Sequence, residues 1–136
     1  MRSLSTILIT AVFILLQSCN NKEPYQLPVY HAKGFVISQE KCSVDSNYNY
    51  SLLDLSIKNT SAETGDSITY KGVKYYHVFK TLSTSNTLHK PGNKVEFDYT
   101  FLNNDHAKTQ STSCDAPDAE TFLLIDINLL NVKEIN

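Results

Sequence analysis

Arginine is almost absent from this chain of 136 residues, in which Arg2 is the only one. If residues 1–18 are removed, as argued below, the remainder carries 11 Lys and no Arg against 14 acidic residues, a net charge of −3. Binding sites for phosphate or nucleic acid depend on bidentate Arg contacts and on an excess of positive charge. The composition therefore argues against a nucleic-acid partner, and the length allows one small domain.

Short catalytic motifs are also missing. The chain contains no GxSxG or HExxH motif and no glycine-rich phosphate loop. Its histidines are too far apart in sequence to include the close ligand pair that most metal sites show; they are His31, His77, His89 and His106. We therefore expect a non-enzymatic protein without a metal or cofactor.

A cluster of acidic residues near the C-terminus offers one alternative. Asp115, Asp118 and Glu120 could contribute oxygen ligands to a loose calcium loop. The segment has no Gly at the turn position, so a solvated acidic loop is the expected structure.

The N-terminus has the plan of a secretory signal. Arg2 precedes an apolar run over residues 7–16, and small and polar residues follow it. At about 1.5 Å per residue, such a run spans roughly 15 Å of a membrane core about 30 Å thick, which is too short for a transmembrane helix. Residues 1–18 are therefore predicted to be a cleaved signal peptide.

The junction Leu16-Gln17-Ser18-Cys19 resembles the lipobox of bacterial lipoproteins. The resemblance implies cleavage before Cys19, diacylation of its sulfur, and acylation of its new amine with palmitate or a similar chain. Residues 19–28 would form a lipidated tether. Asn20 replaces the Asp that retains some lipoproteins in the inner membrane, which favours the outer membrane and leaves the periplasmic or surface face open. A free thiol is the alternative.

Once Cys19 is assigned to lipid, Cys42 and Cys114 remain. An oxidising envelope compartment and an even number of cysteines predict a disulfide between them. The chain-entropy model gives about 4 kcal/mol for closing a loop of this length. A redox or metal-binding pair is the alternative, but the chain has no CxxC motif.

The sequence of residues 29–136 predicts an all-β domain. Apolar residues alternate with polar ones over 95–101, which predicts a half-buried strand. Further strands are predicted at 30–38, 53–58, 73–80 and 123–129, with a short strand at 67–70 and a bulge near Leu129 or Leu130. A helical turn is predicted within 82–89, capped by Ser83 or Ser85.

Two of these strands carry specific expectations. In the strand at 123–129, the alternation predicts an apolar face and a solvent-facing set, namely Leu123, Ile125, Ile127 and Leu129 against Leu124, Asp126 and Asn128. In the strand at 73–80, the period of two predicts one face of Val73, Tyr75, His77 and Phe79 and an opposite face of Tyr76 and Val78. Apolar residues on both faces predict a strand that is covered on both sides or that changes partners at a corner.

The order of elements resembles the small OB-like lipoproteins of Gram-negative envelopes. The residues that carry the resemblance are Gly34, Val36, Ile37, Cys42, Gly72, Gly92, Val95, Phe97, Tyr99, Cys114, Ile125 and Ile127. It implies a five- to six-stranded antiparallel barrel over residues 29–136, with a β-sandwich as the alternative fold. It implies fold and location only, because no shared activity is established for that group.

Tyrosines provide the candidate recognition surface. Tyr48 and Tyr50 alternate with Asn, and Tyr75 adjoins Tyr76, a composition that is typical of protein-binding surfaces. The alternative function is therefore a protein-binding inhibitor or immunity-type lipoprotein with an envelope or extracellular protein as partner. Ser67 lies in an Asp-Ser-apolar tripeptide of the kind that some Gram-negative bacteria O-glycosylate.

Overall fold

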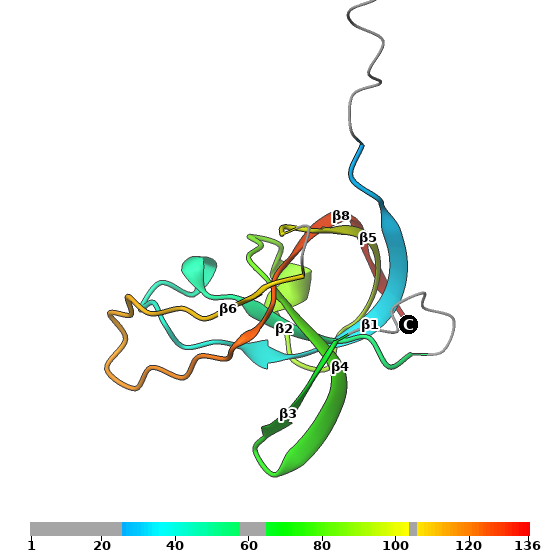
Figure 1. Ribbon diagram of the computed structural model, residues 1–136. Coiled ribbons are helices and arrows are strands. Elements are labelled where there is room, and N and C mark those ends of the chain that lie inside the picture. Colours follow the sequence, from blue (N-terminus) through cyan, green and yellow to red (C-terminus); the bar gives the residue numbers. More distant parts are fainter. Residues whose placement is uncertain (1–25, 58–64, 104–105) are drawn as a thin grey trace, which may run out of the picture.

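A computed structural model describes residues 26–57, 65–103 and 106–136 (Figure 1). One antiparallel sheet has the order β3-β4-β2-β1-β5-β8. Its strands are β1 (Tyr30–Gln39), β2 (Ser51–Asp54), β3 (Asp66–Tyr70), β4 (Val73–Thr81), β5 (Lys94–Phe101) and β8 (Ile127–Ile135). A two-stranded sheet pairs β6 (Lys108–Thr109) with β7 (Leu124–Ile125), and the 3-10 helices are η1 (Ser46–Tyr48) and η2 (Asn86–His89).

The predicted all-β fold is confirmed, and the large sheet curls strongly (Figure 1). An isolated parallel bridge between Lys80 in β4 and Asp126, just before β8, brings the two sides of the sheet together at one point. Over the described strands this contact does not extend into a closed barrel. The predicted signal peptide, Cys19 and the first residues of the predicted tether lie outside the described residues, as does Lys58 at the end of the strand predicted at 53–58. No helix in the described part of the chain is long and apolar enough to cross a membrane.

The alternating segment 95–101 forms β5 as predicted. Val95, Phe97 and Tyr99 are buried, while Glu96 and Asp98 face outward. Tyr99 stacks on Tyr30 at 5.4 Å between ring centroids, where the two residues are cross-strand partners. These aromatic contacts join β5 to β1 inside the larger of two hydrophobic clusters.

The central strands are buried on both faces. In β1, β2 and β4 the adjacent residues pack alternately into the two clusters, which explains runs without strict alternation. These adjacent pairs are Val36 with Ile37, Leu52 with Leu53, and Val78 with Phe79. The second cluster also contains Tyr70 and Leu124, so the β3–β4 hairpin and the segment before β8 cover the outside of the sheet.

The predicted faces of β4 are wrong because His77 interrupts the alternation. His77 has φ of 55°, and the β3–β4 register shifts between Asp66 and Ile68. Tyr75 therefore packs in the same cluster as Val78, whereas Phe79 enters the larger cluster. The structure does confirm a strand that is covered on both sides toward its end.

The strand predicted at 123–129 is also corrected. Leu123 is exposed, whereas Leu124 and Asp126, which were predicted to be solvent-facing, are buried. The chain crosses here from the small sheet to the large one, so the period of two does not continue from β7 into β8. The predicted bulge is present close by, at Asn131 with φ of 52°, where the β5–β8 register shifts.

Other local predictions hold in whole or in part. The helical turn is η2, with Ser85 at the N-cap position, although the Ser85 side chain makes no capping hydrogen bond. The strand predicted at 53–58 is only partly confirmed, because β2 spans Ser51–Asp54. The disulfide between Cys42 and Cys114 is confirmed, with Cα atoms 4.4 Å apart.

Candidate functional site

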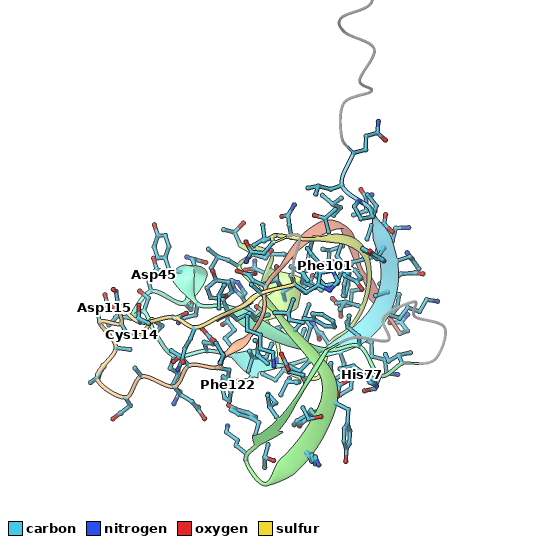
Figure 2. All side chains as sticks on the ribbon, viewed as in Figure 1. Asp45, His77, Phe101, Cys114, Asp115 and Phe122 are labelled. Atoms are coloured by element: carbon cyan, nitrogen blue, oxygen red, sulfur yellow. A yellow bond between two sulfur atoms is a disulfide. The ribbon has the colours of Figure 1, made fainter. Side chains whose placement is uncertain are left out.

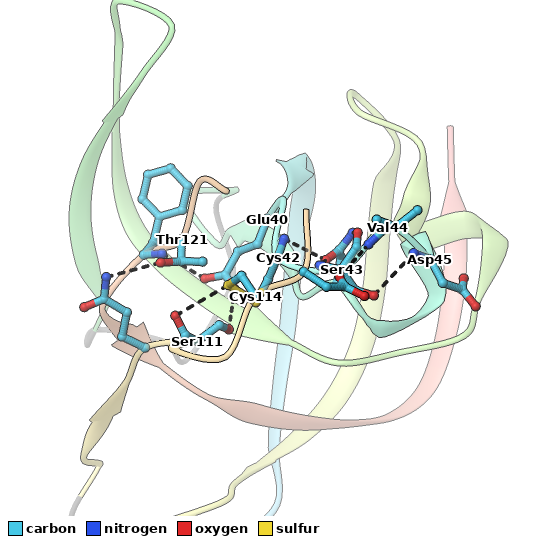
Figure 3. The surroundings of a disulfide bond; sticks show 12 residues. Glu40, Cys42, Ser43, Val44, Asp45, Ser111, Cys114 and Thr121 are labelled. Atoms are coloured by element: carbon cyan, nitrogen blue, oxygen red, sulfur yellow. Dashed lines mark hydrogen bonds between the residues drawn. A yellow bond between two sulfur atoms is a disulfide. The ribbon is translucent and has the colours of Figure 1, made fainter. Parts of the chain in front are cut away.

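The disulfide fastens an irregular segment, residues 106–123, to the end of β1; we call this segment the disulfide loop (Figure 3). The amides of Asp115 and Ala116 both donate to the carbonyl oxygen of Cys42, at 2.9 and 3.0 Å. Lys41 and Glu120 exchange two backbone hydrogen bonds. The part of the loop that follows Cys114 is therefore held to Lys41 and Cys42 by backbone hydrogen bonds in addition to the disulfide.

Beneath the disulfide loop lies a buried ion pair. Lys80 Nζ is 3.4 Å from Glu40 Oε1, and both side chains have zero solvent exposure. The Lys80 ammonium also donates to the carbonyl oxygen of Phe122 at 3.2 Å and lies 4.6 Å from the centre of the Tyr50 ring. A charge this deep in the protein requires such partners, because desolvation of an unpaired ammonium is costly.

Glu40 is satisfied by the disulfide loop as well as by Lys80. Its Oε1 accepts a hydrogen bond from the Phe122 amide at 2.9 Å, and its Oε2 accepts one from the Ser111 hydroxyl at 2.8 Å. Phe122 in turn packs edge-on against Tyr70, between the disulfide loop and the β3–β4 hairpin (Figure 2). The ion pair thus ties β1, β4 and the disulfide loop together.

Asp126 and Tyr50 extend this buried cluster. Burial, followed by the nearby charge of Asp126, raises the pKa of Tyr50 to about 12, and burial also raises the pKa of Asp126. Asp126 Oδ1 is buried and accepts no hydrogen bond from the described residues. Groups of the disulfide loop supply most of the hydrogen bonds to Glu40 and one to Lys80, so the cluster fastens that loop to the sheet.

A second cluster lies on the outer face of β1, β5 and β8. It surrounds a depression of about 370 Å³ lined by His31, Glu96, Phe97, Asp98, Asn131 and Lys133. The β1–β5 register pairs His31 with Asp98 and Lys33 with Glu96, which places their outward side chains side by side. Lys33 Nζ is 3.4 Å from Glu96 Oε1.

His31 is held by two carboxylates. Its Nδ1 is 2.9 Å from Asp98 Oδ1, and its Nε2 is 3.1 Å from Glu96 Oε1. Ionised carboxylates only accept hydrogen bonds, so this arrangement favours the imidazolium form, in which both ring nitrogens donate. The hydrogen bond to Asp98 is the main cause that raises the pKa of His31. Because both nitrogens are occupied, this ring is suited to tying strands together rather than to accepting a proton from a substrate.

The pKa values of the two carboxylates, Asp98 and Glu96, are lowered. The hydrogen bond from His31 is the main cause that lowers the pKa of Asp98. Desolvation acts to raise the pKa of Glu96, but hydrogen bonds from His31 and Lys33 and the charge of Lys33 outweigh it and lower that pKa.

The predicted recognition tyrosines are placed on separate elements. Tyr48 in η1 is 68% exposed, and Tyr76 in β4 is 50% exposed. Tyr50 belongs to the buried cluster, and Tyr75 packs against Phe35. Of the four, Tyr48 and Tyr76 are therefore exposed, whereas Tyr50 and Tyr75 are partly buried. Ser67 is exposed on β3, at the edge of the large sheet.

The other side chains considered as metal ligands are engaged in separate local contacts. His89 Nε2 lies 2.7 Å from the carbonyl oxygen of Ser83, and the His106 ring stacks on Phe101. Asp115 Oδ1 accepts a hydrogen bond from the amide of Val44. Across residues 26–57, 65–103 and 106–136, no group of three or more His, Cys, Asp or Glu side chains is arranged to hold a metal ion.

Sequence reasoning missed both clusters, since each joins residues that are distant along the chain. Glu40 and Lys80 are 40 positions apart, and His31 and Asp98 are 67 positions apart. A lysine directly after the apolar Val78-Phe79 pair was the one local signal of a buried charge. Comparison with protein-family models, with curated proteins and with solved structures finds no match.

Replacing Lys80 with Met is expected to lower the free energy of unfolding by about 3–5 kcal/mol, because the buried Glu40 carboxylate loses its counter-charge. Urea denaturation measures this change. Lys33→Met is the matched control: Lys33 Nζ is also 3.4 Å from a glutamate oxygen, but that pair is partly exposed to solvent and its loss should change stability much less. A similar loss of unfolding free energy in both variants would contradict a larger contribution from the buried pair.

The outer cluster predicts a pH dependence of stability. The contribution of His31 to the free energy of unfolding is fully present below the unfolded-state pKa of 6.5. It is lost as the pH rises through the raised pKa of the folded state. The contributions of Glu96 and Asp98 are complete above 4.5 and are lost as the pH falls through their lowered values. The cluster should therefore stabilise most between about pH 4.5 and 6.5.

This window is checked by measuring the urea midpoint against pH. His31→Gln should remove part of the fall in stability above pH 6.5, whereas His89→Gln should retain it. An unchanged pH profile in the His31 variant contradicts the assignment.

Proposed function

We propose that this protein is a lipid-anchored component of the bacterial cell envelope, with a non-enzymatic, OB-like β-barrel domain held at the outer membrane by acyl chains on Cys19. The domain would begin after a tether at about residue 29 and would face the periplasm or the cell surface.

One observation carries this proposal. The Cys42–Cys114 disulfide uses two of the three cysteines in the chain. Structural disulfides are typical of oxidising compartments outside the cytoplasm, which agrees with a secretory signal. The cysteine that is left over is Cys19, which stands at the lipobox position.

The sheet order supports the OB-like assignment. Five strands of the large sheet, β1, β2, β4, β5 and β8, have the neighbours expected of a five-stranded barrel. The parallel bridge between Lys80 and Asp126 joins β4 to the start of β8, where such a barrel would close. The β3–β4 hairpin then projects from this barrel.

The side-chain clusters support a non-enzymatic role. In the buried cluster the groups that could donate or accept protons are used to hold the disulfide loop. In the outer cluster His31 is engaged at both nitrogens. Both arrangements stabilise the domain and leave its exposed surface to carry function.

Cys19→Ser is expected to abolish incorporation of labelled fatty acid and to release the protein from the membrane fraction. Ser18→Gly keeps a small residue before the cysteine and is the matched control, which should remain acylated. Acyl labelling that persists in the Cys19 variant would disprove the anchor.

A protein-binding inhibitor or immunity-type lipoprotein is the second candidate function. The exposure of Tyr48 and Tyr76 favours it, because large exposed aromatic rings supply contact area at low entropic cost. The Tyr76 ring also lies 5.1 Å from Lys74 Nζ, which holds a cation beside the aromatic surface.

The second candidate predicts a stoichiometric protein partner in a cross-linked pull-down from envelope extracts. Tyr48→Ala combined with Tyr76→Ala should remove that partner, while Leu123→Ala, which alters a similarly exposed side chain, should retain it. A partner list that is unchanged by the tyrosine substitutions excludes this function.

A further inference from the structure

Three uncharged chain segments meet at the end of the sheet where β1 begins; we call them the apolar rim. They are residues 26–30, 99–103 and 127–131. The strand register brings them together, since Tyr30 pairs with Tyr99 and Phe101 pairs with Ile127. None of the 15 residues is charged, although 19% of the whole chain is.

The apolar rim exposes large aliphatic side chains. Leu27, Val29 and Leu102 are 45%, 59% and 57% exposed, and Leu130 is 37% exposed. Tyr30 and Phe101, which lie next to Val29 and Leu102 in sequence, have ring centroids 5.3 Å apart. The exposed residues therefore flank one contact between β1 and β5 rather than being scattered over the domain.

The polar members of the rim are Asn, Gln, Thr and Tyr. Uncharged polar and Tyr side chains are accommodated at the level of lipid headgroups, where their apolar parts enter the acyl boundary. The nearest charged groups on β1 and β5 are His31 and Asp98, which pair with each other. Because no charged side chain of the rim would have to be desolvated, contact of this surface with a bilayer carries little electrostatic cost.

We propose that the apolar rim rests on the membrane to which the protein is anchored, so that the domain is oriented rather than freely suspended. This inference rests on the proposed lipidation of Cys19. Val29 lies ten steps along the chain from Cys19, a distance of at most about 35 Å at full extension. The tether thus keeps the rim within about one domain diameter of the bilayer, so the high effective concentration lets a weak contact persist.

The same orientation directs the β3–β4 hairpin away from the membrane. Figure 1 shows the start of β1 and the hairpin turn at opposite ends of the domain. The hairpin carries Lys71, Lys74 and the exposed Val73, in contrast to the uncharged rim.

Single-tryptophan reporters test the orientation, because the chain contains no Trp. Leu102→Trp places a reporter in the rim, and Val73→Trp places one in the hairpin at a similar starting exposure of 52%. The mature, lipidated protein is reconstituted in vesicles of phosphatidylethanolamine and phosphatidylglycerol that contain brominated lipids. Bromine should quench the rim reporter at least about threefold more than the hairpin reporter.

A second pair of variants separates contact from mere proximity. With Val29→Trp as the reporter, Leu102→Asp should reduce quenching, because a carboxylate in the rim opposes insertion, whereas Val73→Asp should leave it unchanged. Equal quenching of the Leu102 and Val73 reporters in acylated, vesicle-bound protein overturns the orientation but leaves the anchor intact. A mature protein that lacks acyl mass overturns the proposed function, and the orientation with it.

Discussion

The ion pair between Glu40 and Lys80 connects parts of the chain that the hydrogen-bonded sheet alone does not hold together. Glu40 follows β1, Lys80 lies in β4, and both contact Phe122 in the disulfide loop. The pair is fully buried, so its charges require all of these partners at once. The disulfide and the Lys41–Glu120 backbone bonds then close the outer side of the same loop. An irregular segment of the chain thereby becomes a fixed cover over one face of the sheet.

Local sequence patterns were sufficient where one face of a strand is buried and the other is solvated. The alternation in β5 is the clearest example, and the turn at η2 follows from its local residues. The patterns failed where both faces are covered. His77 adopts a positive φ and reverses the faces of β4, while Leu124 and Asp126 are drawn inward by packing and by the buried cluster. The paired charges of both clusters lie far apart along the chain, and a single sequence does not reveal which distant residues meet.

The distribution of charge gives the domain distinct surfaces. Buried charges clamp the disulfide loop, the His31 cluster ties β1 to β5, and the rim where β1 begins has no charge. Tyr48 and Tyr76 project from other elements. This division agrees with a protein that is held and oriented at a membrane at one end and that presents its aromatic side chains elsewhere.

The assignment of the three cysteines is the central claim, and the intact mass of the protein purified from membranes and alkylated without reductant tests it most directly. The account predicts a chain that begins at Cys19, carries acyl groups, lacks two hydrogens because of the disulfide, and bears no alkyl group. An alkylated Cys42 or Cys114, or a mature chain without acyl mass, would contradict it.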